Sequence, residues 1–428
     1  MHRMVLLLSL LLFCSTLAAQ QEPLTDKKEQ KALVEEFRGL DRREEEAFAR
    51  QVEILARLST VPLAKAKDVK TWKKTIAKDS KKHGRRLEGK SGSFHWWEEK
   101  RHGFYIVGGK TSKPKGLLIG MHGGGVGSGD ARNSASAMSG AASKLGWVAI
   151  FPEVLEKTER GWTDSGTEEW VLDLVDAALR TWDIDPNKVY FAGHSMGGYG
   201  SWALGAHHAD RVAALAPSAG APSPIYNRDD TINSIEKGIV LNLRNVPMVV
   251  YQSIDDPQVP PDANQAAVKD VAKAKKKYGG YEDFTYWEVN GRGHGFPDGG
   301  MLALLEKIED FERQPIQDKI VWQPVLKWKR QNGYLYWREP QVGRVLIVER
   351  DAESNTIGFE TRADLSTMEV LLDERVVDME KEVVITVNGK ETNRGLPQPD
   401  LGTLVLTSQS GDAGRTFLAR MPVHGSTD

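Results

Sequence analysis

The spacing of apolar side chains changes twice along the 428-residue chain and divides it into three regions. In residues 21–90, which are dense in Lys, Arg and Glu, apolar positions recur every three or four residues. This period predicts a helix over about 27–58, followed by a strongly basic segment from Lys65 to Arg86. We interpret that segment as a solvated helix packed on the main body, and an arm that binds anionic surfaces is the alternative.

The second region, residues 91–314, alternates short apolar runs with helical stretches and Gly-rich turns. Helical spacing covers 168–181 and 264–278. Alternation of strands and helices predicts an α/β fold with a doubly wound, mostly parallel sheet that helices cover on both faces. The runs expected to form its strands are Gly116–Met121, Trp147–Phe151, Val189–Ala192, Val212–Ala216, Pro247–Tyr251 and Phe284–Val289.

In the third region, residues 315–428, short alternating segments follow one another without a helical pattern between them. Asn388-Gly389, directly after the run Val383–Val387, is typical of a two-residue hairpin turn. The pattern predicts a small all-β domain that resembles a sandwich. Its expected strands lie at 325–328, 334–337, 342–348, 356–360, 368–372, 382–387 and 403–406.

Residues 1–20 have the layout of a secretory signal peptide, with a basic start, an apolar run from Val5 to Phe13 and small residues near Ala18. We therefore expect a secreted or periplasmic protein with no stable membrane insertion after signal cleavage, and a membrane anchor is the alternative. The only cysteine, Cys14, lies within the signal, so the mature chain is expected to contain no disulfide. A formal net charge of −2 does not favour a nucleic-acid partner.

The candidate chemistry centres on Ser195. The run Val189–Ala192 leads directly into Gly193-His194-Ser195-Met196-Gly197, and a helix-compatible stretch follows. A G-x-S-x-G sequence at a strand-to-helix turn is typical of a nucleophile elbow, in which a strained turn lifts the serine oxygen clear of the sheet. The two glycines leave room for that turn. An ordinary Gly-rich turn is the alternative.

A serine hydroxyl needs a neighbouring base that takes its proton. In the order serine, acid, histidine, the last place fits His294, in the Gly-rich loop after the run 284–289. His207 and His208, beyond the elbow helix, are expected at the surface. The acid that orients the imidazole should follow the run 247–251, where Asp255 and Asp256 stand side by side.

An oxyanion hole needs two backbone N–H donors near the nucleophile. Met196, the residue after the serine, is expected to supply one. The other should come from His122-Gly123-Gly124-Gly125, which follows an earlier strand, and Gly124 is the first choice. A flexible Gly-rich loop without a role in the site is the alternative.

Several aromatic residues are secondary candidates. Trp162, Tyr199 and Phe296 could shape the substrate cleft, whereas Trp170 is expected in the core. Aspartates and histidines do not cluster at metal-ligand spacing, so we expect no metal and no cofactor.

Residues from about 115 to 300, under half of the chain, resemble the α/β-hydrolase superfamily. They are similar to secreted esterases related to polyhydroxybutyrate depolymerases and feruloyl esterases, and to predicted peptidases related to prolyl oligopeptidase. The most specific match is Ile184–Tyr190 leading into Gly193–Gly198. The resemblance implies the α/β-hydrolase fold and a triad of Ser195, Asp256 and His294.

Asp256 is preferred over Asp255 because Asp-Pro-x-Val-Pro frequently ends this loop in the fold, and Asp255 stays the alternative acid. One departure affects the same loop: Tyr251-Gln252-Ser253 stands where relatives often have His-Gly.

Three hypotheses about function follow. The first is hydrolysis of a small-molecule or polymeric carboxylic ester through an acyl-enzyme on Ser195. The second is a serine peptidase with the same triad, although about 70 residues before the catalytic region are too few for a propeller domain. The third is a protein whose C-terminal domain contacts a polysaccharide or a cell surface through Trp322, Trp328 and Trp337, with core packing of these aromatics as the competing explanation.

Overall fold

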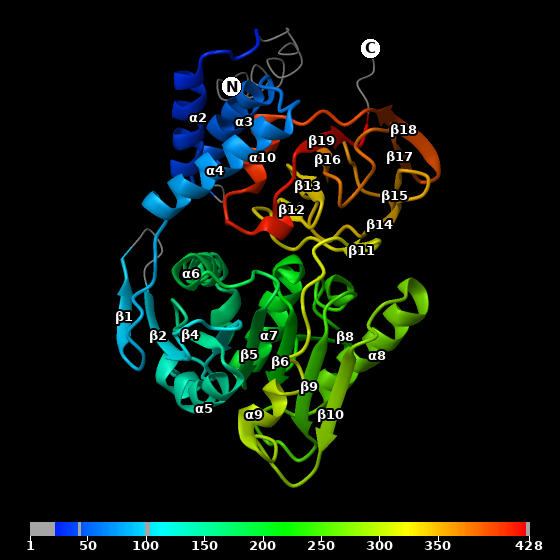
Figure 1. Ribbon diagram of the computed structural model, residues 1–428. Helices are drawn as coiled ribbons and strands as arrows, with labels where there is room; N and C mark the ends of the chain where they lie inside the picture. Colours follow the sequence, from blue (N-terminus) through cyan, green and yellow to red (C-terminus); the bar gives the residue numbers. More distant parts are fainter. Residues whose placement is uncertain (1–21, 42–43, 99–102, 425–428) are drawn as a thin grey trace, which may run out of the picture.

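The computed structural model describes residues 22–41, 44–98 and 103–424. The expected signal peptide, residues 1–20, lies outside these ranges. Figure 1 shows two layers of structure: an α/β part below, and above it a part in which the first helices lie beside the C-terminal strands. Within the described ranges, no helix combines the length and the apolar character needed to cross a membrane.

An eight-stranded sheet in the order β1-β2-β4-β3-β5-β6-β9-β10 forms the centre of the α/β part. The strands from β4 to β10 in this order are parallel, and β1 and β2 add an antiparallel edge. All six strands expected from the sequence are present: β3 Leu117–Met121, β4 Val148–Pro152, β5 Val189–His194, β6 Ala214–Ser218, β9 Met248–Ser253 and β10 Phe284–Val289. The sequence pattern missed β1 Phe94–Trp97 and β2 Gly103–Gly109.

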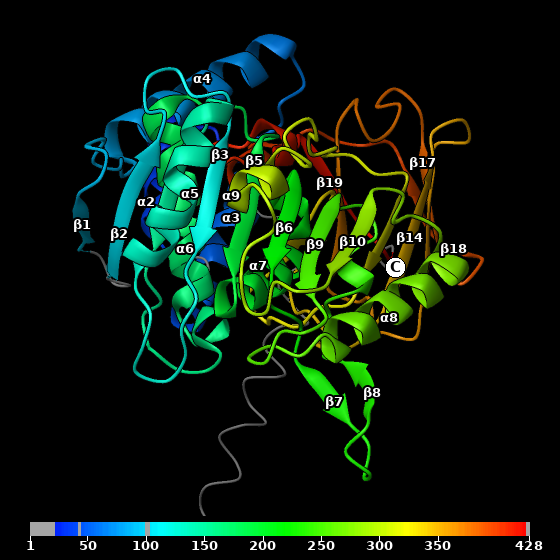
Figure 2. The same cartoon turned by 90° about the horizontal axis from the view of Figure 1, so that it is seen from below.

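Helices cover both faces of this sheet, as predicted. Apolar side chains of α5 (Ala131–Leu145) and α9 (Gly300–Leu305) fill the core on one face. The core on the other face takes residues from α6 (Thr167–Trp182), α7 (Met196–His207) and α8 (Asp262–Tyr278). This doubly wound arrangement is the α/β-hydrolase fold. A hairpin of β7 (Pro224–Tyr226) and β8 (Ile232–Ile235) projects from it (Figure 2).

The expected single helix over 27–58 is wrong, because the chain forms two helices there. α2 (Lys27–Gly39) ends at Leu40, whose backbone is extended, and α3 (Glu45–Ser59) follows. The apolar period continues across the break because both helices face the same core. The expected basic helix is present as α4 (Ala66–His83).

The C-terminal part contains two sheets, β11-β14-β15-β17-β18 and β12-β13-β16-β19. The hairpin turn at Asn388-Gly389 is confirmed, with φ angles of 49° and 78°. The strands are β11 Lys319–Trp322, β12 Gln331–Asn332, β13 Leu335–Trp337, β14 Leu346–Asp351, β15 Thr356–Thr361, β16 Met368–Leu372, β17 Val383–Val387, β18 Lys390–Gly395 and β19 Ala419–Pro422.

Two of the expected C-terminal strands are wrong. Residues 325–328 form a loop, and 403–406 belong to a helix, α10 (Leu401–Thr407). The carboxylate of Asp400 caps this helix by accepting a hydrogen bond from the N–H of Thr403 at 2.8 Å. All seven residues of α10 are buried, so the run has no polar face that would have revealed a helical period.

The N-terminal helices and the C-terminal strands share one hydrophobic core. The N–H of Leu63 donates to the carbonyl of Pro399 at 2.8 Å, and that of Leu401 to the carbonyl of Val61 at 3.0 Å. Trp322 and Trp337 lie in this core with about 1% and 0% of their surface exposed, which agrees with core packing for these two side chains.

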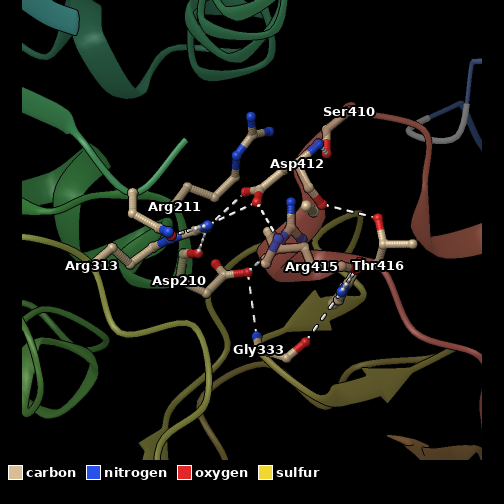
Figure 3. Close-up of polar contacts among 12 residues, drawn as sticks. Asp210, Arg211, Arg313, Gly333, Ser410, Asp412, Arg415 and Thr416 are labelled. Atoms are coloured by element: carbon tan, nitrogen blue, oxygen red, sulfur yellow. Dashed lines mark hydrogen bonds and ion pairs between the residues drawn. The ribbon is translucent and has the colours of Figure 1, made fainter. Parts of the chain in front are cut away.

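Buried ion pairs join the C-terminal part to the α/β part (Figure 3). The guanidinium of Arg313 makes two hydrogen bonds to the carboxylate of Asp412, at 2.7 and 2.8 Å. The carboxylate of Asp210, in the 3-10 helix η2 (Ala209–Arg211), lies 2.9 Å from the Nε atom of Arg415 in η4 (Ala413–Arg415). Removal of one partner from such a pair leaves a buried charge without compensation.

Candidate active site

Ser195 occupies the strained turn that the sequence predicted. β5 ends at His194, α7 begins at Met196, and the φ and ψ angles of Ser195 are 60° and −125°. A Cβ atom on Gly193 would lie 2.3 Å from the carbonyl oxygen of Gly197, and one on Gly197 would lie 2.2 Å from that of Met121. Only glycine therefore fits on either side of the turn.

His294 and Asp256 form a hydrogen-bonded pair. Nδ1 of His294 lies 2.8 Å from Oδ2 of Asp256. The other carboxylate oxygen of Asp256 accepts hydrogen bonds from the N–H groups of Gln258 and Val259, both at 2.9 Å. The side chain of Asp256 is fully buried, and that of His294 is 14% exposed. The carboxylate is thus fixed in place and faces the imidazole.

Asp255 binds the backbone of the same loop. Its carboxylate accepts hydrogen bonds from the N–H groups of Gly291 and Gly293 at 3.0 and 3.2 Å, and from the hydroxyl of Ser253. The Ser253 hydroxyl and these N–H groups lower the pKa of Asp255. The structure therefore places Asp256 on the imidazole of His294 and Asp255 on the loop that carries it.

The Gly-rich loop after β3 packs directly against the nucleophile. A Cβ atom on Gly123 would lie 3.1 Å from the Cβ of Ser195. The buried ring of His122 holds this loop: its Nδ1 donates to the carbonyl of Gly123 at 2.9 Å, and its Nε2 accepts from the N–H of Val154 at 3.1 Å. Burial lowers the pKa of His122, in agreement with a neutral ring in these two roles.

A cavity of about 370 Å³ brings these elements together. Ser195, His294 and Gly124 all line it, and Met196 is the first residue of the helix behind it. No hydrogen bond joins Ser195 to His294 among the contacts of the described residues. Within the same ranges, no group of three or more His, Cys, Asp or Glu side chains is placed to hold a metal ion.

Of the aromatic residues proposed to shape the substrate cleft, one lines the cavity and two do not. Phe296 lines the cavity. Trp162 is fully buried and donates from its indole to the carbonyl of His122 at 3.2 Å, so it supports the loop and does not line the cavity. The hydroxyl of Tyr199 contacts Arg160 and Thr163, also outside the cavity. Trp170 is in the core, as expected.

His207 and His208 are not surface residues, contrary to the expectation. Both bind the carboxylate of Glu168, at 3.0 and 3.1 Å, and His208 is only 1% exposed. The C-terminal part covers this side of the α/β part, as the ring of Trp328 stacks on His208 with a centroid distance of 5.6 Å. The sequence of the α/β region alone could not show that cover.

The sequence did not single out one wall of the cavity. Asn133, Ser134, Ala137 and Met138 from α5, together with Met301 from α9, line it. α5 is rich in Ala, Ser and Gly, so its apolar period is weak and the helix was missed.

His194, next to the nucleophile, contacts the candidate base. Its Nε2 lies 3.2 Å from the carbonyl oxygen of His294 and its Nδ1 lies 3.0 Å from the hydroxyl of Ser218. Because a carbonyl oxygen only accepts, Nε2 carries the proton and Nδ1 accepts from the serine. Burial and the neighbouring His294 lower the pKa of His194 to about 4, so the ring is neutral near pH 7.

The chain matches no protein-family profile. It is 28% identical over 121 residues to a bifunctional acetylxylan esterase/xylanase, XynS20E, of Neocallimastix patriciarum, a match that covers 24% of this chain and 18% of that protein. Similar solved structures include a thermostable esterase, with 18% identity, a TM-score of 0.39 and coverage of 52% of this chain and 63% of the other. Another is the acetyl xylan esterase from Aspergillus awamori, with 13% identity, a TM-score of 0.35 and coverage of 47% and 94%.

The fold assignment rests on the geometry of this chain. The sheet order, with the chain leaving β3 for β4 and returning to β5 on the other side, puts the ends of β3 and β5 at a topological switch point, where open α/β sheets bind ligands. The strained Ser195 turn lies at that point. The chain therefore has the α/β-hydrolase fold, with a tight serine turn at the position that binds ligands in such sheets.

Proposed function

We propose that the protein is a serine esterase that hydrolyses a carboxylic ester through an acyl-enzyme on Ser195. One observation carries the proposal: the strained Ser195 turn opens into the same cavity as the His294 imidazole, whose Nδ1 is bound to buried Asp256. A serine held in this way, beside an oriented base, is the arrangement that activates a hydroxyl for attack on an acyl carbon.

In the first step, Oγ of Ser195 attacks the carbonyl carbon of the ester while Nε2 of His294 takes the hydroxyl proton. The tetrahedral intermediate then expels the alcohol, which receives that proton from the imidazolium. Asp256 fixes the tautomer with a proton on Nδ1, because its carboxylate can only accept there. Water, deprotonated by His294, attacks the acyl-enzyme and releases the acid and free Ser195.

The negatively charged oxygen of each tetrahedral intermediate needs hydrogen-bond donors that stabilise it. We propose the N–H groups of Met196 and Gly124 for this role. Met196 begins α7, so its N–H has no partner within the first turn of the helix and lies at the positive end of the helix dipole. Gly124 lines the cavity in a backbone conformation, φ 150°, that favours glycine.

The cavity wall formed by Ala137, Met138 and Met301 suits a small, apolar acyl group. The sequence relative named as an acetylxylan esterase/xylanase supports an acetyl ester on a polysaccharide as the substrate class. Export from the cytoplasm, expected from residues 1–20, fits such a polymer and is part of the proposal.

The test compares the parent protein with Ser195→Ala on 4-nitrophenyl acetate, acetylated xylan and a short peptide 4-nitroanilide, and separate samples of both proteins are labelled with a fluorophosphonate probe. We expect labelling and ester hydrolysis by the parent, and a loss of at least about 10³-fold in kcat/KM in the variant. Equal ester hydrolysis by both proteins contradicts the proposal. Peptide cleavage that exceeds ester cleavage assigns the triad to a peptidase instead.

A further inference from the structure

A second cavity lies on the other side of the α/β part. Its volume is about 700 Å³, and its walls come from the N-terminal helices, from α6 and from the C-terminal part. His208 and Arg211, which follow the C-terminal end of α7, belong to the wall, whereas Ser195 precedes the N-terminal end. A helix of 12 residues is about 18 Å long, so this cavity is separate from the candidate active site.

Positive charge predominates in the wall. Asp41, Asp173 and Asp176 are its carboxylates. Three further carboxylates lie outside the wall and form contacts with its residues or their neighbours. Asp79 pairs with Arg38, and Asp210 pairs with Lys329. Glu168 binds His207 and His208. The cationic side chains that line the cavity outnumber the three carboxylates among the lining residues: Arg38, Arg85, Arg180, Arg211, Lys329, Arg330 and Arg415.

Arg180 lines the cavity without a direct carboxylate partner among the described residues. Its Nε donates to the carbonyl of Arg85 at 3.1 Å, and no carboxylate of the described residues forms an ion pair with its guanidinium. Burial lowers the pKa of Arg180, although Asp176 and Asp173 lie close enough to oppose that effect. A half-buried guanidinium keeps up to five N–H donors, and one carbonyl satisfies only one of them.

Lys329 and Arg415 share a single carboxylate. The ammonium of Lys329 and the guanidinium of Arg415 both pair with Asp210, and Arg415 reaches that carboxylate at 2.9 Å. Burial lowers the pKa of Lys329 to about 8, with Asp210 opposing the effect. The direct ion pairs thus set two cations against one buried carboxylate, and Asp412 also acts electrostatically on Arg415.

The size and the walls of the cavity favour an organic anion over a simple inorganic one. Small-molecule sites usually measure about 300–1,000 Å³, a range that includes this cavity. Trp328 and Tyr336 contribute aromatic surface, and Gln51, Gln331 and Gln409 contribute amides. Aromatic rings, amides and arginines together suit a ligand with a hydroxylated ring and an acidic group.

We propose that this cavity is a binding site for an acidic sugar, in which Arg180 binds the anionic group. A uronate carboxylate and a sugar phosphate or sulfate share the chemistry that the guanidinium recognises. The site is independent of the proposed esterase activity, because it contains neither Ser195 nor His294.

Isothermal titration calorimetry of the full chain at low ionic strength tests the site with glucuronate, glucose 6-phosphate, glucose and inorganic phosphate. We expect binding of at least one acidic sugar and none of glucose. Arg180→Gln should weaken the binding by about tenfold or more, since a charge-assisted hydrogen bond is lost. Glucuronate alone identifies a carboxylated ligand, and glucose 6-phosphate alone a phosphorylated one.

Arg362→Gln, which removes the same charge from an exposed position outside the cavity, is the matched control and should bind like the parent. Arg180→Lys should recover part of the affinity. Unchanged hydrolysis of 4-nitrophenyl acetate in Arg180→Gln shows that the variant is folded. The proposal is overturned by binding of inorganic phosphate as tight as that of the sugars, by equal binding of glucose, by no binding at all, or by full affinity in Arg180→Gln.

Discussion

Asp256 accepts a hydrogen bond from Nδ1 of His294 at 2.8 Å, with its carboxylate fully shielded from solvent. The adjacent Asp255 makes no such contact and instead binds the backbone of the histidine loop. Two neighbouring residues of the same type therefore have different surroundings, and this difference can be measured.

Asp256→Asn should reduce kcat/KM on 4-nitrophenyl acetate by about 10³- to 10⁴-fold, because an amide can present the imidazole with a donor and favour the wrong tautomer. Asp255→Asn should cost about tenfold or less, since it weakens the loop without changing the tautomer. Steady-state kinetics of both variants check this. A larger loss for Asp255→Asn would make Asp255 the orienting acid.

Gly193→Ala should destabilise the protein by several kcal/mol, because its Cβ would meet the carbonyl oxygen of Gly197 at 2.3 Å. Gly140→Ala is the control, as a Cβ there, within α5, meets nothing within 4 Å. The control should gain up to about 1 kcal/mol from helix propensity. Urea unfolding gives the free energy of unfolding of both variants. Equal stability of the two would contradict the prediction that only glycine fits at position 193.

Asp412→Asn should cost about 3–5 kcal/mol of unfolding free energy, since it leaves the buried guanidinium of Arg313 without its counter-charge. Asp298→Asn removes a comparable partner from the exposed Arg292 and should cost less than about 1 kcal/mol. The comparison uses urea unfolding of both variants at pH 7. Equal losses would show that the Arg313 pair does not stabilise the junction of the two parts.

Stability should fall as the pH drops from about 6.5 towards 4. Burial lowers the pKa of His208 to about 4, and burial with the nearby His294 does the same for His194. Both rings stay neutral in the folded protein, while the unfolded chain gains their protons below the ordinary pKa near 6.5. The stabilisation is therefore complete above pH 6.5 and is lost at up to about 1.4 kcal/mol per pH unit for each group.

His208→Gln keeps a side-chain donor for Glu168 but removes the titration, so the slope of stability against pH between 6.5 and 4.5 should become shallower. The slopes are obtained from the unfolding free energies of each protein, measured by urea titration at four pH values. An identical slope in parent and His208→Gln removes His208 as a source of the pH dependence.

In the α/β part, six strands of the sheet and the tight turn at Ser195 could be predicted from the sequence, because both follow from local patterns of residues. The reason is that a buried parallel strand needs a continuous apolar run, and a turn with φ of 60° at Ser195 needs glycines on both sides. These demands act on a few neighbouring residues, so they are visible in the linear chain.

Only the tertiary structure decided which aspartate faces His294, because Asp255 and Asp256 have the same chemistry and differ only in direction. It also decided that 403–406 is a helix, since a fully buried run loses its period. His208 is buried because residues far along the chain, such as Trp328, cover it. Burial of this kind arises from contacts between distant segments, which no local pattern of residues records.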